Sequence, residues 1–537
     1  MSAPSRLSAW VREGSHPDRE EILSRARRWN ADLDSRNAPP AVHLDDAREA
    51  FAFLLACWSR GWAPLLLPDR QDATLALHGP GAVLEPLPSG SPERPLDSAP
   101  ANLDAVAVRF LTSGSTGARK QVPKTFGQIE GECEDQRGWS GELLAGRRIL
   151  TTVSHQHIYG FLFLLARPAL EGLPFPERRD FYWEEMVPRL RRGPCTLVTS
   201  PSHLQHLVAG LDAAEGLDLL VLSSGGAVSD AAGRTLARGA RLLEIYGSTE
   251  TGGVARRAWT PEGSGAWIPF ASVGWSISPD EGRLVLRSPW ADPDHPHRTD
   301  DLAEPDGDGF RLRGRADRVV KLSEKRLSLE ELEEAVRATG LCDDARACVV
   351  EGGRRQELGL AAEPSRAGWE ILLREGRPAL ADRLRQELSQ RFEPVLLPRR
   401  FRFSPLPRNP QGKVVLAELA AHIAQPEISL DGIGAACVRT ETGLEARVRV
   451  PANYPRLEGH FPGSPVVPGV AQLHWALDAA RTLEPGFSAR QAEAVKFQSV
   501  LRPGVEAVLA VSRHNTGWRF SIEGIDGRKY SSGRLLP

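Results

Sequence analysis

Residues 105–120 read AVAVRFLTSGSTGARK, an apolar run that ends in a turn of Gly, Ser and Thr and closes on Lys120. A buried strand followed by such a turn supplies what a phosphate cradle needs. Glycines let backbone N–H groups approach a ligand, hydroxyls donate hydrogen bonds and a lysine offsets negative charge. The turn is not a G-x-x-x-x-G-K-[ST] loop, because only two residues separate Gly114 from Gly117, and a plain Gly/Ser turn is the alternative.

Short apolar runs alternate with helical periods on both sides of this stretch. Residues 45–62 have helical period, and residues 64–68 favour a short buried strand. The alternation predicts an α/β fold with several strands and helices. Four further runs bounded by Gly, Ser or Pro predict strands, and they lie at 147–153, 195–200, 217–223 and 241–247.

Composition narrows the class of protein. The 537 residues carry 67 basic and 69 acidic side chains, so a nucleic-acid binder that relies on a dominant basic field is disfavoured. Six cysteines without a C-x-x-C pair favour a reducing cytoplasm over a disulfide framework or a zinc site. The N-terminus lacks an apolar signal region, and the apolar runs at 51–58 and 159–166 are far shorter than the ~20 residues that span a bilayer. We expect a cytoplasmic protein with no membrane span and no nucleic-acid partner.

The pattern of apolar and polar residues changes twice after residue 313. Amphipathic periods predict helices over 328–339 and 377–392, typical of a small α+β unit. Residues 422–434, HIAQPEISLDGIG, have the composition of a linker. The last 110 or so residues alternate with period two and contain one strong helix at 469–482, which predicts a helix wrapped by a curved antiparallel sheet.

Five motifs between residues 111 and 413 identify a family. They resemble, in order, the phosphate loop, Y-G-x-T-E, T-G-D, G-R-x-D and L-P-x-[TN]-x-x-G-K segments of the ANL superfamily of adenylate-forming enzymes. The resemblance implies an N-terminal adenylation core at 1–313 and a small mobile domain at 314–422. The motifs in this chain are TSGSTGARK at 112–120, IYGSTE at 245–250, RTDD at 298–301, GRAD at 314–317 and LPRNPQGK at 406–413.

The resemblance also implies an ATP site. Tyr246 would stack on adenine, Thr249 would bind a phosphate oxygen, and Asp301 and Arg315 would bind the ribose hydroxyls. The implied ATP-binding set is Thr112, Ser113, Gly114, Ser115, Thr116, Gly117, Lys120, Ser224, Gly225, Gly226, Ala227, Tyr246, Gly247, Thr249, Asp301 and Arg315.

Three further residues take catalytic or mechanical roles by the same resemblance. Glu250 would bind Mg²⁺. Lys413 would bridge the substrate carboxylate and the α-phosphate, since one positioned cation offsets the repulsion between two anions. Asp317 would be the hinge about which the small domain rotates between adenylation and thioester formation.

The chain departs from the family pattern at several positions. Asp300 replaces the Gly of T-G-D, which adds a charge beside the ribose site. Glu324 stands where a Gly usually lines the pantetheine tunnel, and this favours an acyl carrier protein over CoA as the acceptor. His157 fits the position beside the substrate carboxylate, with a packed or surface histidine as the alternative. Residues 304–309 superficially resemble a calcium loop, but a hairpin turn is favoured.

A second motif near the C-terminus, GHFPGSPVVPGV at 459–470, resembles the signature of the β-hydroxyacyl-ACP dehydratases, which are hot-dog folds. This resemblance implies an α+β hot-dog domain at 423–537. Dehydration of a 3-hydroxyacyl thioester needs a base for the α-proton, and a histidine such as His460 suits that task. The helix that begins at Gly469 would polarise the thioester carbonyl through its N-terminal dipole.

The dehydratases usually carry an acidic residue fourteen positions after the histidine, and here that residue is His474. Helical spacing places Val470, His474 and Leu477 on one face, which we expect to be buried. A pair of histidines, His460 and His474, could divide the acid and base roles. The alternative is a degenerate hot-dog domain that only binds acyl chains or dimerises the protein.

Together the resemblances imply an AMP-forming acid–thiol ligase with a second, dehydratase-like activity, similar to proteins of bacterial aryl polyene and polyketide clusters. ATP and Mg²⁺ would be its cofactors. An aryl or fatty acid would be its substrate, and CoA or the phosphopantetheine of a carrier protein would be its acceptor. A homodimer through the hot-dog domain is expected. A carrier-protein docking factor without catalysis is the rival from a different class.

Overall fold

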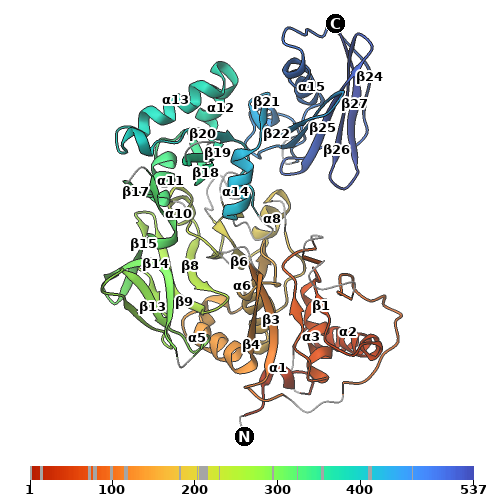
Figure 1. The fold of residues 1–537 in the computed structure, drawn as a ribbon. Helices are drawn as coiled ribbons and strands as arrows, with labels where there is room; N and C mark the ends of the chain where they lie inside the picture. The colour runs from red at the N-terminus through yellow and green to blue at the C-terminus, as the bar shows by residue number, and fades with distance from the viewer. Residues whose placement is uncertain are drawn as a thin grey trace. The chain divides into compact units, whose positions relative to one another are not determined.

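The structure is a computed structural model, and it describes residues 3–12, 16–70, 74–75, 81–96, 101–113, 119–180, 183–201, 203–204, 216–228, 230–292, 295–322, 325–351, 356–408, 414–461 and 464–537. The chain divides into two compact units (Figure 1). The first consists mainly of residues up to Arg313, and the second mainly of residues from Gly314 onward.

Three sheets organise the first unit. Their strand orders are β1-β2-β3-β4, then β10-β9-β8-β7-β6-β5 with β11 paired to β9, and β12-β13-β14-β15. The strands are β1 (Ala41–Val42), β2 (Leu65–Leu66), β3 (Val106–Ser113), β4 (Arg119–Thr125), β5 (Arg148–Thr151), β6 (Cys195–Thr199), β7 (Leu219–Ser224), β8 (Arg241–Ser248), β9 (Gly252–Thr260), β10 (Gly263–Ser264), β11 (Ile268–Pro269), β12 (Gly274–Ile277), β13 (Arg283–Arg287), β14 (His297–Asp306) and β15 (Gly309–Arg315).

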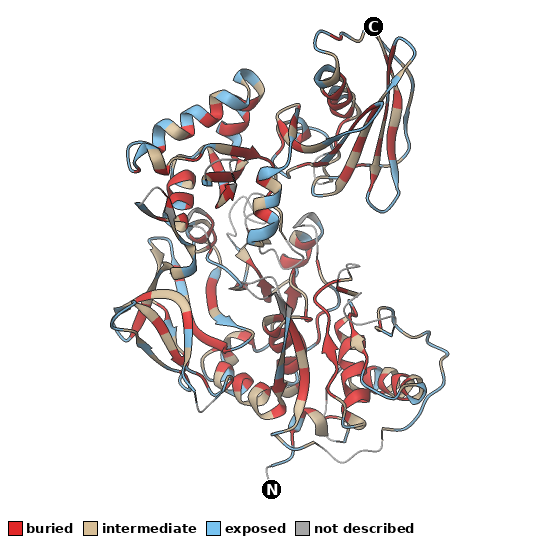
Figure 2. Cartoon of the chain, in the orientation of Figure 1, coloured by how far each residue is buried: buried red, intermediate tan, exposed pale blue. Residues whose placement is uncertain are grey.

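The predicted α/β architecture is confirmed by the second of these sheets. Strands β5 to β8 run parallel to one another. All five residues of β6 and the first five of β7 are buried. Figure 2 colours much of the interior of the first unit as buried. Parallel strands covered on both faces need such unbroken apolar runs, which is why these segments could be recognised in the sequence.

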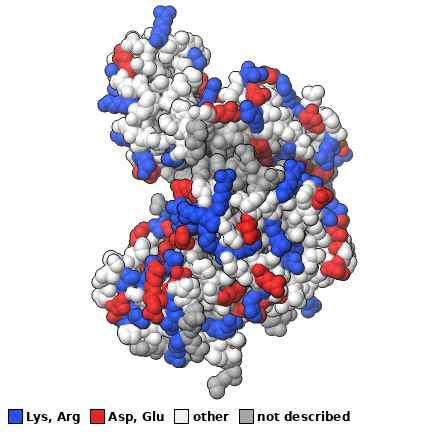
Figure 3. All heavy atoms as spheres, turned by 180° about the vertical axis from the view of Figure 1, so that it is seen from behind, with Lys and Arg blue, Asp and Glu red and all other residues white. Residues whose placement is uncertain are grey.

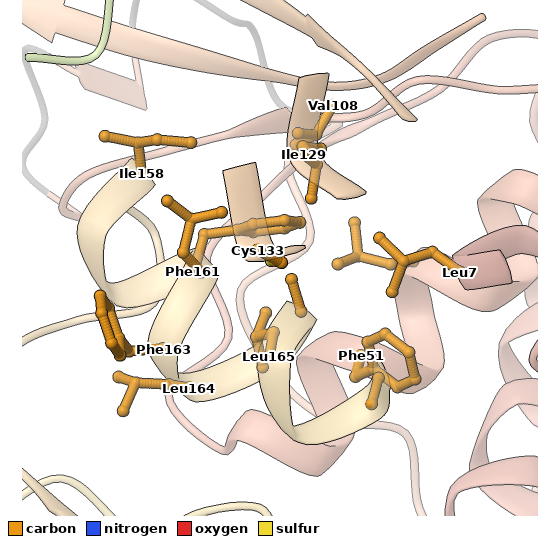
Figure 4. Packing of buried hydrophobic residues seen from close by; sticks show 14 of the residues in the cluster. Leu7, Phe51, Val108, Ile129, Cys133, Ile158, Phe161, Phe163, Leu164 and Leu165 are labelled. Atoms are coloured by element: carbon orange, nitrogen blue, oxygen red, sulfur yellow. The ribbon is translucent and has the colours of Figure 1, made fainter. Parts of the chain in front are cut away.

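Helices of the first unit pack around one large hydrophobic core. Figure 4 shows Phe51 from α3 and Leu165 from η2 among the side chains that fill it. A capping box joins the end of β4 to α5, because Thr125 and Gln128 each accept a backbone hydrogen bond from the other. The helices are α1 (Arg6–Ala9), α2 (Arg19–Asp32), η1 (Leu33–Ser35), α3 (Ala47–Ser59), α5 (Phe126–Leu144), α6 (Ile158–Phe161), the π-helical turn η2 (Leu162–Ala166), α7 (Arg167–Glu171), α8 (Trp183–Leu190) and α10 (Asp230–Leu236).

The second unit begins with a small α+β part. It contains the hairpin β16-β17 and the sheet β18-β19-β20. The predicted helices are present as α11, which Ser328 caps, and α13. The elements are η3 (Ala316–Arg318), β16 (Val319–Leu322), β17 (Lys325–Ser328), α11 (Leu329–Ala338), β18 (Cys342–Glu351), β19 (Gln356–Pro364), α12 (Arg366–Glu375), α13 (Arg377–Leu388), η4 (Pro394–Leu396), β20 (Arg400–Phe403) and α14 (Leu416–Ala424).

The rest of the second unit is a hot-dog fold. Its antiparallel sheet has the order β21-β22-β23-β25-β26-β27-β24, and one long helix, α15, packs against it (Figure 1). The elements are β21 (Glu427–Leu430), β22 (Ile433–Arg439), β23 (Gly443–Arg449), η5 (Pro455–Leu457), α15 (Gly469–Leu483), β24 (Gln491–Phe497), β25 (Glu506–His514), β26 (Gly517–Gly524) and β27 (Lys529–Leu536).

The prediction of a linker at residues 422–434 is wrong. The segment holds the end of α14, all of β21 and the start of β22, and Ile428, Leu430 and Ile433 are buried. One hydrophobic cluster runs through both parts of the second unit, and Trp369 and Tyr454 meet in it with ring centroids 5.4 Å apart. The alternating apolar residues of this segment form a strand because their side chains are buried in the hydrophobic cluster shared with the small α+β part.

The surface charge and the polarity of the helices both bear on the class of protein. Acidic and basic side chains are both spread over the face shown in Figure 3, as expected for a chain with a formal charge of -2. Among the described residues, every helix is too short or too polar to cross a membrane.

Candidate active sites

The predicted phosphate loop connects the two strands of a hairpin. Strands β3 and β4 pair in antiparallel register, with Thr112 opposite Lys120 and Ser113 opposite Arg119. The loop therefore begins and ends at one end of this hairpin. Lys120 is exposed there. Of the predicted site residues, Gly114, Ser115, Thr116, Gly117 and Lys413 lie outside the described residues, and so does Glu324.

Two of the predicted residues, Tyr246 for the purine and Asp301 for the ribose, come together near the carboxyl end of the parallel strands. Tyr246, in β8, donates a hydrogen bond from its hydroxyl to Asp301 Oδ2 of β14 at 2.5 Å. Its ring lies between Trp267 and Phe310, with centroids 5.6 and 6.0 Å away. The sequence placed Tyr246 and Asp301 in one site through separate motifs 55 residues apart, and the hydrogen bond joins them directly.

The neighbouring strand contributes the Gly225–Ala227 segment. Ser224 ends β7 and donates from its hydroxyl to the carbonyl of Ile245 on β8 at 2.8 Å. Gly225 then adopts a φ of +93°, a conformation that favours glycine, and Gly225, Gly226 and Ala227 are exposed. The main chain of this segment is open to a ligand beside Tyr246, since β7 and β8 are adjacent.

The turn that carries Thr249 and Glu250 is tight. A Cβ atom on Gly247 would lie 2.3 Å from the carbonyl oxygen of Gly252, so only glycine fits there. Ser248 and Thr251 close the turn with backbone-to-hydroxyl hydrogen bonds of 3.1 Å. Glu250 is exposed and lines an open cleft of about 300 Å³. Carboxylate oxygen is the ligand that Mg²⁺ prefers, so Glu250 fits the role that the motif implies.

The unusual Asp300 is neutralised within the first unit. Its carboxylate forms an ion pair with Arg283 of β13, and Arg283 also pairs with Glu281. The hydrogen bond with Asp300 raises the pKa of Arg283. The extra charge at the T-G-D position is therefore matched by a cation that the sequence analysis did not single out, because the two residues meet only through strand pairing.

The predicted hinge lies at the start of the second unit. Gly314 has a φ of +104°, and a Cβ atom there would lie 2.4 Å from Glu330 Oε2. Arg315 and Asp317 form a bidentate ion pair with both N–O distances at 2.9 Å. The hydrogen bond from Arg315 lowers the pKa of the Asp317 carboxyl. A carboxylate held in this way stays ionised at neutral pH.

The predicted acid-pocket residue begins a helix that enters the core. His157 is the half-buried N-cap of α6. Two residues earlier, burial lowers the pKa of His155 to about 4, and its Nε2 lies 2.8 Å from the carbonyl of Leu44. Tyr159 donates to the carbonyl of Leu222 on β7 at 2.7 Å, a tie that sequence spacing did not reveal. The segment 304–309 is part of the hairpin of β14 and β15, as expected, with residues 307–308 as its turn.

In the hot-dog fold, His460 and Phe461 stand at an exposed turn. The backbone N–H of His460 donates to the carbonyl of Leu457 at 3.0 Å, and the two rings meet edge-on at 5.2 Å. Phe461 has a φ of 57°, which is costly for a residue with a side chain. Helix α15 then starts at Gly469, where a Cβ atom would lie 2.5 Å from the ring of Phe497. Strain and a close approach are typical of functional loops.

The predicted burial of one face of α15 is wrong. Val470 is 60% exposed, His474 is exposed and Leu477 is half-buried. The helix instead turns another face inward, since small and aromatic side chains there fit against the sheet. Its buried residues are Ala471, Gln472, Trp475, Ala476, Ala479 and Ala480. His474 therefore faces outward from the single chain, near Asp431 and Asp478, and burial raises the pKa of the Asp478 carboxyl.

The chain thus joins a region with an α/β fold and the predicted ATP motifs to a hot-dog domain, and comparisons with known proteins agree with both. A family model described as "AMP-binding enzyme" matches residues 63–289, and one described as "ApeI dehydratase" matches residues 437–534. Through the second region the chain belongs to the family of the hot-dog dehydratases, and its first region is similar to the AMP-binding enzymes.

Individual relatives agree with this division. A 4-coumarate–CoA ligase of Rhodobacter capsulatus is 29% identical over 275 residues, 49% of this chain and 66% of the relative. A second 4-coumarate–CoA ligase, from Cereibacter sphaeroides, is 26% identical and matched over 51% of its length, so the chain spans less than two thirds of either ligase. The dehydratase FabZ of Ligilactobacillus salivarius is 34% identical over 103 residues, 17% of this chain and 73% of the relative.

Solved structures share the fold of the ligase part. The O-succinylbenzoate CoA synthetase of Bacillus subtilis, solved with ATP and magnesium, has a TM-score of 0.64 at 18% identity, covering 78% of this chain and 100% of that one. A benzoate CoA ligase of Burkholderia xenovorans has a TM-score of 0.62 at 17% identity, covering 77% and 99%. Both are similar to this chain in fold.

Proposed function

We propose that the chain activates a carboxylic acid with ATP to an acyl-adenylate and passes the acyl group to a thiol. The observation that carries the proposal is the hydrogen bond between Tyr246 and Asp301, which joins two ATP motifs in one site beside the exposed turn of Glu250. Relatives named as 4-coumarate–CoA ligases support an aryl acid as substrate. A relative named as a D-alanine–D-alanyl carrier protein ligase supports a carrier protein as one possible acceptor, with CoA as the other.

The residues divide the work in this proposal. Tyr246 and the Gly225–Ala227 segment hold the purine, and Asp301 holds the ribose. Glu250 would hold Mg²⁺, which when bound with ATP offsets the charge of the phosphates. Lys413 approaches the substrate carboxylate and the α-phosphate, so that the carboxylate can attack and pyrophosphate leaves. Arg315 and Asp317 belong to the small domain, whose rotation would exchange the first half-reaction for the second.

The first test is ATP–pyrophosphate exchange in the presence of cinnamic, coumaric, benzoic, fatty or polyenoic acids. Exchange with one class of acid would identify the substrate. We expect Lys413→Ala to lower that exchange about 100-fold, because it removes one positioned charge from the transition state. Absence of exchange with every acid in the wild-type protein would overturn the ligase proposal and favour a carrier-protein docking factor.

For the hot-dog domain we propose dehydration of a 3-hydroxyacyl thioester, with His460 as the base and His474 in the position of the usual acid. The similarity to FabZ supports this activity. The pairing of a ligase with a dehydratase fits the assembly of an unsaturated chain, as in polyene or polyketide biosynthesis. A non-catalytic module that binds acyl chains or dimerises the protein is the alternative.

We further propose that a second copy of the chain covers the outward face around His474. Strand β24 is at the edge of the hot-dog sheet, and an edge strand presents unpaired backbone groups to a partner. Four large apolar side chains are exposed near that edge or on the loops beside it: Phe461 (63%), Val470 (60%), Phe497 (53%) and Val500 (53%). A twofold contact through this face would bury them together.

The dimer is tested by Phe497→Lys. A lysine there places a charge in the proposed contact, so we expect the mass in solution, measured by light scattering or sedimentation, to fall from that of a dimer to that of a monomer. Val438→Lys is the matched control, because Val438 is 68% exposed on β22, away from β24. A monomeric wild-type protein, or an equal effect of Val438→Lys, would contradict the dimer.

A further inference from the structure

Lys124 is a buried cation in a chain that uses few lysines. The sequence has 7 lysines among its 67 basic residues. Lys124 lies in β4, four residues beyond Lys120, and is only 2% exposed. Burial lowers the pKa of Lys124, and the charges of Glu132 and Glu250 oppose that shift. An ammonium group is costly to bury unless it is paired and hydrogen-bonded, so its contacts define its role.

The contacts of Lys124 reach the turn that carries Glu250. Its Nζ donates to the carbonyl oxygen of Glu250 at 3.0 Å and to that of Trp290 at 2.5 Å. These residues are 126 and 166 positions away in sequence. One ammonium therefore joins β4, which follows the predicted phosphate loop, to the backbone of the predicted metal-binding residue.

Two other side chains, those of Glu132 and Ser288, hold the backbone of the same turn. Glu132 of α5 is buried, and its Oε1 accepts a hydrogen bond from the backbone N–H of Gly253 at 2.7 Å. Burial raises the pKa of Glu132 to about 7. Ser288 donates to the carbonyl of Thr251 at 2.6 Å. The backbone at Glu250 and directly after it, at Thr251 and Gly253, is thus held by buried side chains.

The carboxylate of Glu250 is left facing outward by this arrangement. Glu250 is exposed, whereas Thr251, Gly252 and Gly253 directly after it are buried. Glu250 and Lys124 both line the open cleft of about 300 Å³. The carbonyl of Glu250 is therefore fixed to Lys124 while its side chain stays accessible to a cation.

We propose that Lys124 is a positioning residue, which sets the direction of the Glu250 carboxylate toward the metal ion that accompanies ATP. This inference rests on the proposed ligase function, because that function supplies the metal-bound nucleotide. The buried charge of Lys124 does not touch the nucleotide. It acts through the backbone of Glu250, and Glu132 acts with it by holding the backbone N–H of Gly253.

The test is the affinity of the full-length protein for ATP, measured by titration calorimetry with Mg²⁺ and with EDTA. Lys124→Met keeps the length of the side chain and removes its charge and donors. We expect ATP binding with Mg²⁺ to weaken about tenfold, since hydrogen bonds to charged groups are the stronger class. Binding with EDTA is expected to change by less than about twofold, because Lys124 acts only through the metal-binding residue.

Arg167→Met is the matched control. Arg167 is another fully buried cation of the first unit, and its guanidinium bonds Glu171 and Ser140 instead of the turn. Its loss is expected to lower the melting temperature and to leave the Mg²⁺-dependent gain in affinity intact. If Lys124→Met fails to fold, Lys124→Met with Glu132→Gln removes both buried charges, retains an acceptor for Gly253, and is measured in the same way.

The outcomes separate the two proposals. An unchanged Mg²⁺-dependent gain in the lysine variant, or an equal loss in Arg167→Met, would overturn the positioning role. Wild-type protein that binds ATP with Mg²⁺ but exchanges pyrophosphate with no acid would overturn the ligase function and still allow Lys124 to be judged. Wild-type protein that gains no affinity from Mg²⁺ would overturn both.

Discussion

Replacing His460 with alanine is expected to lower the rate of 3-hydroxyacyl thioester dehydration about 1000-fold, within the range that a general base contributes. His460 is exposed at a turn where Phe461 is held at positive φ, in the segment that leads to α15. In the proposed reaction its imidazole takes the α-proton of a thioester whose carbonyl is polarised by the N-terminus of that helix. The reaction can be followed in reverse, as the loss of the conjugated absorbance of a 2-enoyl thioester.

His514→Ala is the matched control for this prediction. It removes a histidine from β25 of the same sheet, and we expect the rate to stay within about twofold of the wild type, as for a surface change away from the site. His474→Glu restores the residue type usual in the dehydratases and is expected to keep or raise the rate. An unchanged product profile in His460→Ala would favour the alternative, a hot-dog domain that only binds or dimerises.

The sequence predicted those parts of the fold whose signals are local. Buried parallel strands are unbroken apolar runs, and residues 195–200 and 217–223 could be placed for that reason. Ser328 marks the start of α11 because a side-chain oxygen satisfies a backbone N–H of the first turn. The predicted ATP motifs combine glycine turns with charged residues, and their order along the chain was the basis for the resemblance to the adenylate-forming enzymes.

What the sequence could not supply depends on contacts between distant segments. Val470 is as apolar as a core residue, so spacing alone could not show that the face it shares with His474 is the outward one. No feature of the sequence around Lys124 indicates that its ammonium group donates a hydrogen bond to the backbone of Glu250. The segment 422–434 has the composition of a linker. It contains a strand because Ile428 and Leu430 pack into the hydrophobic cluster that also includes Trp369 of the small α+β part.

The second large effect is expected from Trp369→Ala, which should lower the free energy of unfolding of the second unit by about 3–5 kcal/mol. Trp369 lies in α12, is fully buried, and packs edge-on against Tyr454 of the hot-dog part. Its Nε1 donates to Asn453 at 3.2 Å. Removing the indole leaves a cavity in the hydrophobic cluster that both parts share, so both should lose stability together.

A buried ion pair strengthens the expectation of joint unfolding. Arg402 of β20 is 1% exposed and pairs with Glu427 of β21 at 3.0 Å, and Arg377 also pairs with Glu427 at 2.6 Å. This pair links β20 of the small α+β part to β21 of the hot-dog part, so the two parts share a polar contact as well as the hydrophobic core. The small α+β part and the hot-dog domain should therefore open as one body.

Hydrogen exchange under native conditions measures this coupling. In Trp369→Ala, the slowest amides of α12 and of α15 should lose protection by the same factor, because a shared core opens in one step. Trp259→Ala is the control: Trp259 is a buried tryptophan of the first unit, and its loss should leave the amides of α15 unchanged. If α12 lost protection while α15 kept it, the two parts would be independent, and the hot-dog domain would be free to move on its own beside the small domain.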